Sequence, residues 1–224
     1  MNLDTDDLIH RLVMDAAPVR PLPHPMARVT SWLAISLAYV AAIALAYRLS
    51  GNGVSLTFDR RFLIEELATI ATAVTAAIAA FCCVVPGRDR RIAFLPLLPL
   101  TVWLASLGQG CAKEWLVSGV ASLSPRVGWE CLPASALIGF LPAVAMIVML
   151  RRGAPLYPRS TVVLGALAVA ALGNLGLRLF HAGDVTIMML IWHLGTVALL
   201  LALAGWLGPR VLSWGHFNTV RTAN

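Results

Sequence analysis

Residues 132–150 read LPASALIGFLPAVAMIVML, and Arg151-Arg152-Gly153 follows them directly. The run carries no charged side chain, and its length is close to the roughly 20 residues that an α-helix needs to cross a ~30 Å hydrocarbon layer. Other apolar runs of similar length lie at 31–49, 64–85, 92–110, 160–180 and 185–207. Together the runs predict an all-α membrane protein, a bundle of about six transmembrane helices.

The composition of the whole chain supports a lipid environment. Hydrophobic residues make up 59% of the 224 residues and charged residues 12%, whereas a soluble domain carries roughly a quarter charged residues. The mean hydropathy of +0.80 agrees with this. The net charge is +6, but the arginines come in twos and threes beside apolar runs, and Lys113 is the single lysine. This pattern is typical of membrane loops and argues against nucleic-acid binding.

Residues 1–29 form a polar segment before the first run. Thr5 predicts a helix N-cap, and Asp6 and Asp7 in the following turn suit the helix dipole. Apolar side chains then recur on one side of the predicted helix, at Leu8, Ile9, Leu12, Val13 and Ala16. Pro18 ends the helix, and further prolines follow at positions 21, 23 and 25. The segment is therefore predicted to be a short amphipathic helix on a stiff proline spacer, held by the membrane, the bundle or a partner.

Arginine and lysine residues set the expected orientation. With the N-terminus inside, most of the 17 such residues fall in cytoplasmic segments, which predicts that both termini are cytoplasmic. The chain then divides into a cytoplasmic N-terminal segment with its proline linker (1–29), a six-span domain (30–210) and a cytoplasmic C-terminal tail (211–224). The acidic start argues against a cleaved signal peptide, although Ala44-Leu45-Ala46 resembles a cleavage site.

The four cysteines fall into two pairs along the chain. Cys82 and Cys83 lie near the cytoplasmic end of the run 64–85 and are predicted to be small buried apolar residues. Cys111 and Cys131 lie in or beside the longest connection, on the outer side. A disulfide between them would stabilise the protein by roughly 3 kcal/mol if that side is oxidising. Two unpaired structural cysteines are the alternative.

Ionisable residues in or near the apolar runs are further candidates. His193 lies about two turns inside the last run, and His181 and Asp184 precede it. His181 and Asp184 could form a metal or proton-responsive site with Cys111 or Cys131. As an ionisable residue inside a membrane span, His193 is a functional candidate, and the alternative is that the backbone of a neighbouring helix satisfies it. Glu65 and Glu66 are expected to be helix N-terminal carboxylates near the membrane interface, with a transport pathway as the alternative.

Familiar catalytic motifs are missing from the sequence. It contains no G-x-S-x-G, no phosphate-cradling glycine loop, no H-E-x-x-H and no C-x-x-C. We therefore expect neither an enzyme nor a bound cofactor. A small multi-span transporter or permease subunit is the main alternative function, and a membrane-bound redox enzyme or assembly factor is a third.

The chain carries an ordered set of short motifs, from Thr5-Asp6-Asp7-Leu8-Ile9 near its start to Leu150-Arg151-Arg152-Gly153 and the late Trp192-His193. This set resembles the NrsF family, the negative regulators of sigma F. The start of the family is matched by Thr5-Asp6-Asp7-Leu8-Ile9 with Leu12, by Pro18-Val19 and by the prolines that follow. The most specific elements are Leu150-Arg151-Arg152-Gly153-Ala154-Pro155-Leu156 and the late Trp192-His193. Weaker matches complete the set: Phe81, Val85-Pro86-Gly87, Pro99, Trp103, Cys131-Leu132, Tyr157-Pro158, Gly205 and Gly208.

The resemblance implies a six-span anti-sigma factor of the bacterial inner membrane. Such a protein holds an extracytoplasmic-function sigma factor at the membrane and does not itself bind nucleic acid. Its cytoplasmic N-terminal segment is the expected contact. The candidate sigma-binding residues are therefore Asp6, Asp7, Leu8, Ile9, Leu12, Val13, Asp15 and Pro18. The apolar side chains would anchor the helix in a groove of the sigma factor, and the carboxylates would complement a basic surface.

The resemblance also implies cysteines on the outer side that sense metal or oxidative stress. Cys131 matches one such position. The second is expected shortly before Trp192-His193, where this sequence has Phe180 and His181. Cys111 or His181 could take its place beside Cys131. The candidate signal-sensing residues are therefore Cys111, Cys131, His181 and His193, and whether a metal binds them is left open.

Overall fold

The computed structural model describes residues 5–15, 22–50, 60–119, 131–153 and 157–178, together with the single positions 195, 202 and 206. The regular elements of this part are all helical. They are α1 (Thr5–Met14), α2 (Pro25–Leu49), α3 (Arg60–Cys82), the 3₁₀ helix η1 (Arg90–Phe94), α4 (Leu97–Ser118), α5 (Cys131–Arg151) and α6 (Pro158–Arg178). The all-α fold predicted from the sequence is confirmed for the described part of the chain.

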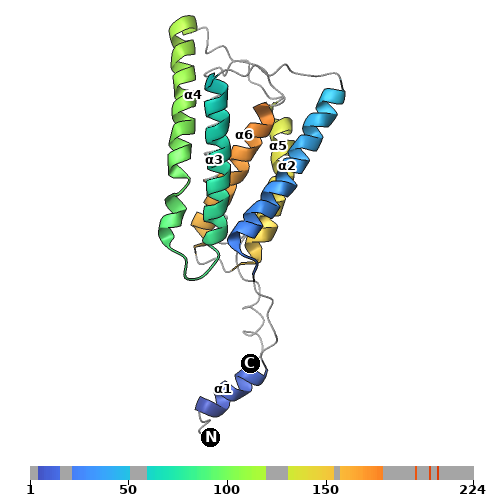
Figure 1. Cartoon of the computed structure of the whole chain (residues 1–224), viewed down its shortest axis with the longest axis vertical. Coiled ribbons are helices and arrows are strands. Elements are labelled where there is room, and N and C mark those ends of the chain that lie inside the picture. The colour runs from blue at the N-terminus through green and yellow to red at the C-terminus, as the bar shows by residue number, and fades with distance from the viewer. Residues whose placement is uncertain are drawn as a thin grey trace.

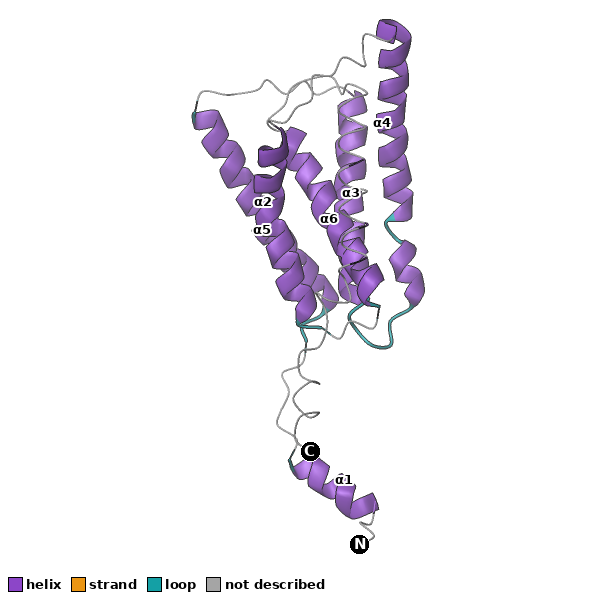
Figure 2. Cartoon of the chain, turned by 180° about the vertical axis from the view of Figure 1, so that it is seen from behind, coloured by secondary structure: helices purple, strands orange, loops and turns teal. Residues whose placement is uncertain are grey.

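Helices α2 to α6 form one bundle in which consecutive helices run in opposite directions (Figure 1). α3 packs against α2, α4 and α6, and α5 packs against α2 and α6. α4 lies at the edge of the bundle beside α3, as the view from behind also shows (Figure 2). α1 lies apart, beyond the end of the bundle at which α2 and α6 begin and α3 and α5 finish. We call this end the proximal end.

Five stretches of helix are long and apolar enough to cross a membrane. They are Pro25–Leu49, Phe62–Cys82, Arg90–Val117, Pro133–Arg151 and Pro158–Leu177. The first five predicted runs are therefore confirmed as helices of sufficient length. The sixth predicted run, 185–207, lies outside the described residues apart from the three single positions.

Two helix ends differ most from the sequence prediction, the start of α2 and the end of α4. α2 begins at Pro25, well before the expected start at residue 31, so Pro25 belongs to the helix and not to the proline spacer. Proline suits the first helical turn because its missing N–H would have no partner there, and His24 Nδ1 accepts a hydrogen bond from the Met26 N–H at 3.3 Å. The second difference is the end of α4, which continues past the predicted end at residue 110 as far as Ser118. Cys111 therefore lies within a helix and not in a loop.

The third apolar run starts late, as its prolines predict. The chain first forms η1, where the Asp89 side chain accepts a hydrogen bond from the Arg91 N–H at 2.9 Å. α4 begins only at Leu97. Pro96 and Pro99 have no N–H to donate, and the positions before and within the first turn of α4 need none.

Small side chains of α3 build the centre of the bundle. The fully buried alanines are Ala76, Ala77, Ala79 and Ala80. Side chains of this size let neighbouring helices approach closely. The hydroxyl groups of Thr69, Thr72 and Thr75 each donate to the carbonyl four residues earlier, at 2.6–2.8 Å, so these polar groups are satisfied within α3.

Three side chains of α2 donate hydrogen bonds to backbone carbonyls of α5. The donors are Arg28, Trp32 and Tyr39. They reach, in that order, the carbonyls of Met149, Pro142 (3.0 Å) and Leu137 (2.8 Å). We call these contacts the α2–α5 seam. Because the acceptors lie successively earlier along α5 as the donors advance along α2, the seam fixes the antiparallel register of the two helices.

Gly176 lets α6 meet α2 and α5 near the other end of the bundle. A Cβ atom at this position would lie 2.6 Å from Ile138 Cγ2 on α5 and 3.2 Å from Val40 Cγ1 on α2. Val40, Ile138 and Leu177 are themselves buried together. A side chain at residue 176 would therefore push these helices apart, because packed interiors have little room for added atoms.

Candidate partner-binding site

The α1 helix carries an apolar stripe that no described part of the protein covers. The stripe consists of Leu8, Ile9, Leu12 and Val13, which are 45–65% exposed. None of the residues of α1 is buried, and the helix stands apart from the bundle in both views (Figures 1 and 2). Uncovered apolar stripes at helical spacing are typical of helices that dock into a groove of another protein. We call these four residues the α1 stripe.

Charged side chains surround the α1 stripe. Asp6 and Asp7 lie in the first turn, where the helix dipole favours carboxylates. Asp7 Oδ2 pairs with Arg11 Nη2 at 2.9 Å, and this exposed pair contributes only about 0.3–0.5 kcal/mol to helix stability. The Asp15 N–H donates to the Arg11 carbonyl at 3.0 Å and closes the last turn. The predicted residues from Asp6 to Asp15 thus share one exposed helix, whereas Pro18 lies outside the described residues.

Arginines crowd the proximal end of the bundle. The exposed ones are Arg88, Arg90, Arg91, Arg151, Arg152 and Arg159. Among the described residues of this end, Asp89 is the single acidic one, and its side chain already accepts the Arg91 N–H. The Arg90 guanidinium lies 4.2 Å from the centre of the Tyr157 ring, which ties η1 to the start of α6. The end of the bundle nearest to α1 is therefore strongly basic.

Arg28 lies just inside the proximal end and joins three helices. Its side chain is 4% exposed. It donates from α2 to the Met149 carbonyl of α5, and its guanidinium lies 4.6 Å from the centre of the Phe81 ring of α3. Arg28 Nη1 has no hydrogen-bond partner among the described residues. Sequence reasoning missed this buried role of Arg28, which its spacing of four from Trp32 could have indicated.

The predicted sensing residues are placed only in part. Cys131 is the first residue of α5, at the end of the bundle opposite to α1, and Cys111 lies within α4. Their side chains, and both His181 and His193, fall outside the described residues, so the predicted pairings stay predictions. In the described part of the chain, no three histidine, cysteine or acidic side chains come together as metal ligands.

Cys82 and Cys83 lie where α3 finishes at the proximal end. Cys82 is buried and Cys83 is half-buried, and both are free thiols, which confirms the predicted burial. Burial, with a smaller contribution from Cys82, raises the pKa of the Cys83 thiol. Cys83 is therefore protonated at neutral pH and is a poor nucleophile or metal ligand.

Glu65 and Glu66 lie in the second turn of α3, close to the predicted position. Both are buried, with 2% and 7% of their surface exposed, and this burial was not predicted from the sequence. The burial arises because Glu65 and Glu66 share the packed face of α3 with Thr69, Thr72 and Ala76. The spacing of these residues is the pattern that could have revealed the burial.

The arrangement defines a small all-helical protein in which a bundle of membrane-spanning length carries a separate, exposed amphipathic helix. The chain belongs to the NrsF family, described as negative regulator of sigma F, whose family model matches residues 12–214. This match confirms the resemblance inferred from the short motifs, and it covers most of the chain. No curated protein and no solved structure matches the chain. Membership of the family implies a regulator that binds a sigma factor and acts negatively on it.

Proposed function

We propose that the protein is an integral anti-sigma factor of the bacterial inner membrane. It holds an extracytoplasmic-function sigma factor at the membrane and releases it on a metal or oxidative stress signal. The observation that carries the proposal is the uncovered α1 stripe, attached to a bundle of membrane-spanning length. A helix of this kind docks in a groove and orders on binding, which suits a regulator that must grip and release its partner.

The outer surface of the bundle supports the placement in lipid. Large apolar side chains point outward on several helices, among them Leu37 on α2, Leu98 on α4 and Phe140 on α5, which are 46–77% exposed. Soluble proteins seldom leave so extended an apolar surface to water. A hydrocarbon layer of ~30 Å would cover this surface along the full length of the helices.

The arginines of the proximal end orient the bundle. Cytoplasmic loops of membrane proteins carry an excess of arginine and lysine, and the exposed arginines Arg88, Arg151 and Arg152 lie at the end nearest to α1. This end is therefore cytoplasmic in our proposal, and α1 faces the compartment that contains sigma factors. Cys131, at the start of α5, faces the opposite side.

We expect alkaline phosphatase to be active when fused after residue 120 and inactive when fused after residue 155. The enzyme folds only where its disulfides form, which is outside the cytoplasm. A reporter that is active only in the cytoplasm, fused at the same two positions, controls for expression and should give the reverse pattern. Phosphatase activity at residue 155 with none at residue 120 would show the opposite topology. α1 would then lie outside the cytoplasm and could not contact a sigma factor.

The α2–α5 seam offers a physical route between the two sides. Cys131 begins α5, and α5 is bonded along its length to α2 through Arg28, Trp32 and Tyr39. α2 in turn begins directly after the linker that carries α1. A shift of α5 caused by chemistry at Cys131 would therefore move α2 and the base of the linker.

Replacement of Cys131 with serine is expected to keep the sigma factor repressed under stress. In cells that carry a promoter reporter for the sigma factor, cadmium or peroxide should induce the wild type by about tenfold or more and the Cys131→Ser variant by less than about twofold, since serine binds soft metals weakly and does not oxidise. Cys83→Ser, at the opposite end, is the matched control and should respond as the wild type does. Full induction of Cys131→Ser would remove Cys131 from the sensing role.

A small transporter is the second candidate function, because Glu65 and Glu66 are buried in a helix of spanning length. Ionisable residues inside a membrane often mark a transport path. These two carboxylates lie near one end of α3 and not at its middle. A transporter also has no use for the α1 stripe, so the two functions differ in whether α1 is required.

A further inference from the structure

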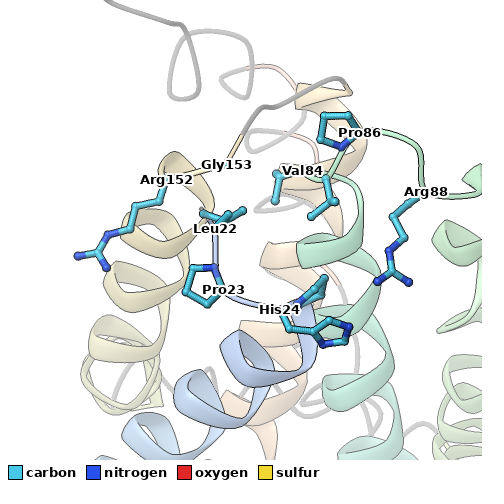
Figure 3. Close-up of a pocket in the computed structure, with 10 residues that line it drawn as sticks. Leu22, Pro23, His24, Val84, Pro86, Arg88, Arg152 and Gly153 are labelled. Atoms are coloured by element: carbon cyan, nitrogen blue, oxygen red, sulfur yellow. The ribbon is translucent and has the colours of Figure 1, made fainter. Parts of the chain in front are cut away.

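A pocket of about 390 Å³ opens at the proximal end of the bundle (Figure 3). Its walls come from three separate segments. The linker before α2 contributes Leu22 and His24, the loop after α3 contributes Val84 and Arg88, and the end of α5 contributes Arg152. The contributing segments lie far apart in the sequence, so the pocket exists only because the helices are assembled.

The pocket lies at the level where phospholipid headgroups would be. Three of the membrane-length stretches have their proximal ends at Pro25, Cys82 and Arg151. Each of these ends lies one to three positions from a residue that lines the pocket, in the same order Leu22, Val84 and Arg152. With the bundle in a bilayer, this is the layer between the hydrocarbon and the cytoplasm.

The lining is apolar on one part and cationic on another. Leu22, Val84 and Val85 supply apolar surface, and Arg88 and Arg152 supply positive charge. In Figure 3 the two arginines lie on opposite sides of Leu22 and His24, and the Arg152 side chain extends outward from them. This combination suits a ligand with a charged head and an apolar body.

Among the described residues, no carboxylate forms an ion pair with the arginines that line the pocket. The two arginines that line the pocket, Arg88 and Arg152, both have exposed side chains. Asp89, the one carboxylate in the described segments around the pocket, accepts the Arg91 N–H. A bound anion would offset the positive charge of Arg88 and Arg152 and accept hydrogen bonds from their guanidinium groups.

We propose that this pocket binds the phosphodiester headgroup of an anionic phospholipid from the cytoplasmic leaflet. Basic pockets between helices at this depth hold such headgroups through arginine–phosphate contacts, and the apolar wall accommodates the glycerol and upper acyl segments. The inference rests on the membrane placement proposed above, but not on the sigma factor.

Headgroup binding would also act on α1. Leu22, Pro23 and His24 form one wall of the pocket, and they are the last linker residues before α2. A lipid held against this wall fixes the direction in which the linker leaves the bundle.

The test measures lipid retention by the full-length protein. The purified protein is exchanged into detergent micelles that contain dioleoylphosphatidylglycerol or dioleoylphosphatidylcholine, and bound lipid is counted by native mass spectrometry. We expect one phosphatidylglycerol to be retained in preference to phosphatidylcholine. The double variant Arg88→Gln/Arg152→Gln should bind phosphatidylglycerol about tenfold or more weakly, since each arginine near a headgroup adds to the attraction. Arg48→Gln, at the far end of α2, is the matched control and should bind as the wild type does.

Several outcomes would overturn the proposal. They are equal retention of the two lipids, unchanged binding by the double variant, or displacement of the lipid by millimolar inorganic phosphate, which would indicate a site for a free anion. Circular dichroism of each variant separates loss of the site from loss of the fold. Sigma-factor binding is measured on the same samples, so a chain that keeps the lipid but binds no sigma factor refutes the proposed function alone.

Discussion

The double variant Leu8→Asp/Leu12→Asp is expected to lose its sigma factor while it remains in the membrane. Each leucine buried in a groove contributes about 1.5–3 kcal/mol, so the loss of both amounts to about 3 kcal/mol or more. This corresponds to a dissociation constant raised by about 100-fold or more. The measurement is the affinity of full-length, detergent-solubilised protein for each purified extracytoplasmic-function sigma factor of the same bacterium.

Met14→Asp is the matched control for this variant. Met14 is exposed and follows Leu12 by two positions, which places it about 200° round the helix and off the α1 stripe. The substitution introduces the same charge on the same helix, so it should leave the affinity within about threefold of the wild type. Binding by Leu8→Asp/Leu12→Asp that equals the binding by Met14→Asp would mean that the stripe is not the contact.

Gly176→Leu is expected to destabilise the bundle strongly. The first added atom would already lie 2.6 Å from Ile138 Cγ2, and the rest of the leucine has no space between α2, α5 and α6. Overpacking of this kind costs about 3 kcal/mol or more, which lowers the thermal midpoint of a chain of this size by about 6–12 °C. The midpoint is measured by circular dichroism in mild detergent, and failure to obtain folded protein is the extreme form of the same result.

Gly173→Leu provides the control on the same helix. A Cβ atom at Gly173 meets no atom within 4 Å, so the same substitution one turn earlier should shift the midpoint by no more than about 2 °C. Equal effects of the two substitutions would show that helix propensity or expression, and not the crossing of α2, α5 and α6, determines the loss.

The helices could be predicted from the sequence because their causes are local. Apolar runs such as 132–150 predict both the length of a helix and its lipid environment. The prolines at 96 and 99 predict the late start of α4. The start of α2 at Pro25 was missed because a proline that ends a spacer and a proline that begins a helix look alike in sequence. The end of α4 at Ser118 was missed because its last turns carry charged residues, which a hydropathy argument assigns to a loop.

The candidate site likewise has features with local causes, which could be predicted, and features that depend on helix pairing, which could not. The α1 stripe follows from the periodicity of a dozen residues, so its exposure on a separate helix could be anticipated. The buried role of Arg28, the α2–α5 seam and the burial of Glu65 and Glu66 depend on which helices become neighbours. Contacts such as Trp32 with Pro142 join residues 110 positions apart, and hydrophobic periodicity carries no information about such pairings.

The most direct measurement is the distribution of the sigma factor between membrane and cytosol in unstressed cells. The sigma factor should sediment with the membranes when the wild-type chain is present and move to the soluble fraction when the chain carries Leu8→Asp/Leu12→Asp, while the chain itself sediments in both cases. A sigma factor that stays soluble beside the wild-type chain, or that remains membrane-bound beside the variant, would contradict the account.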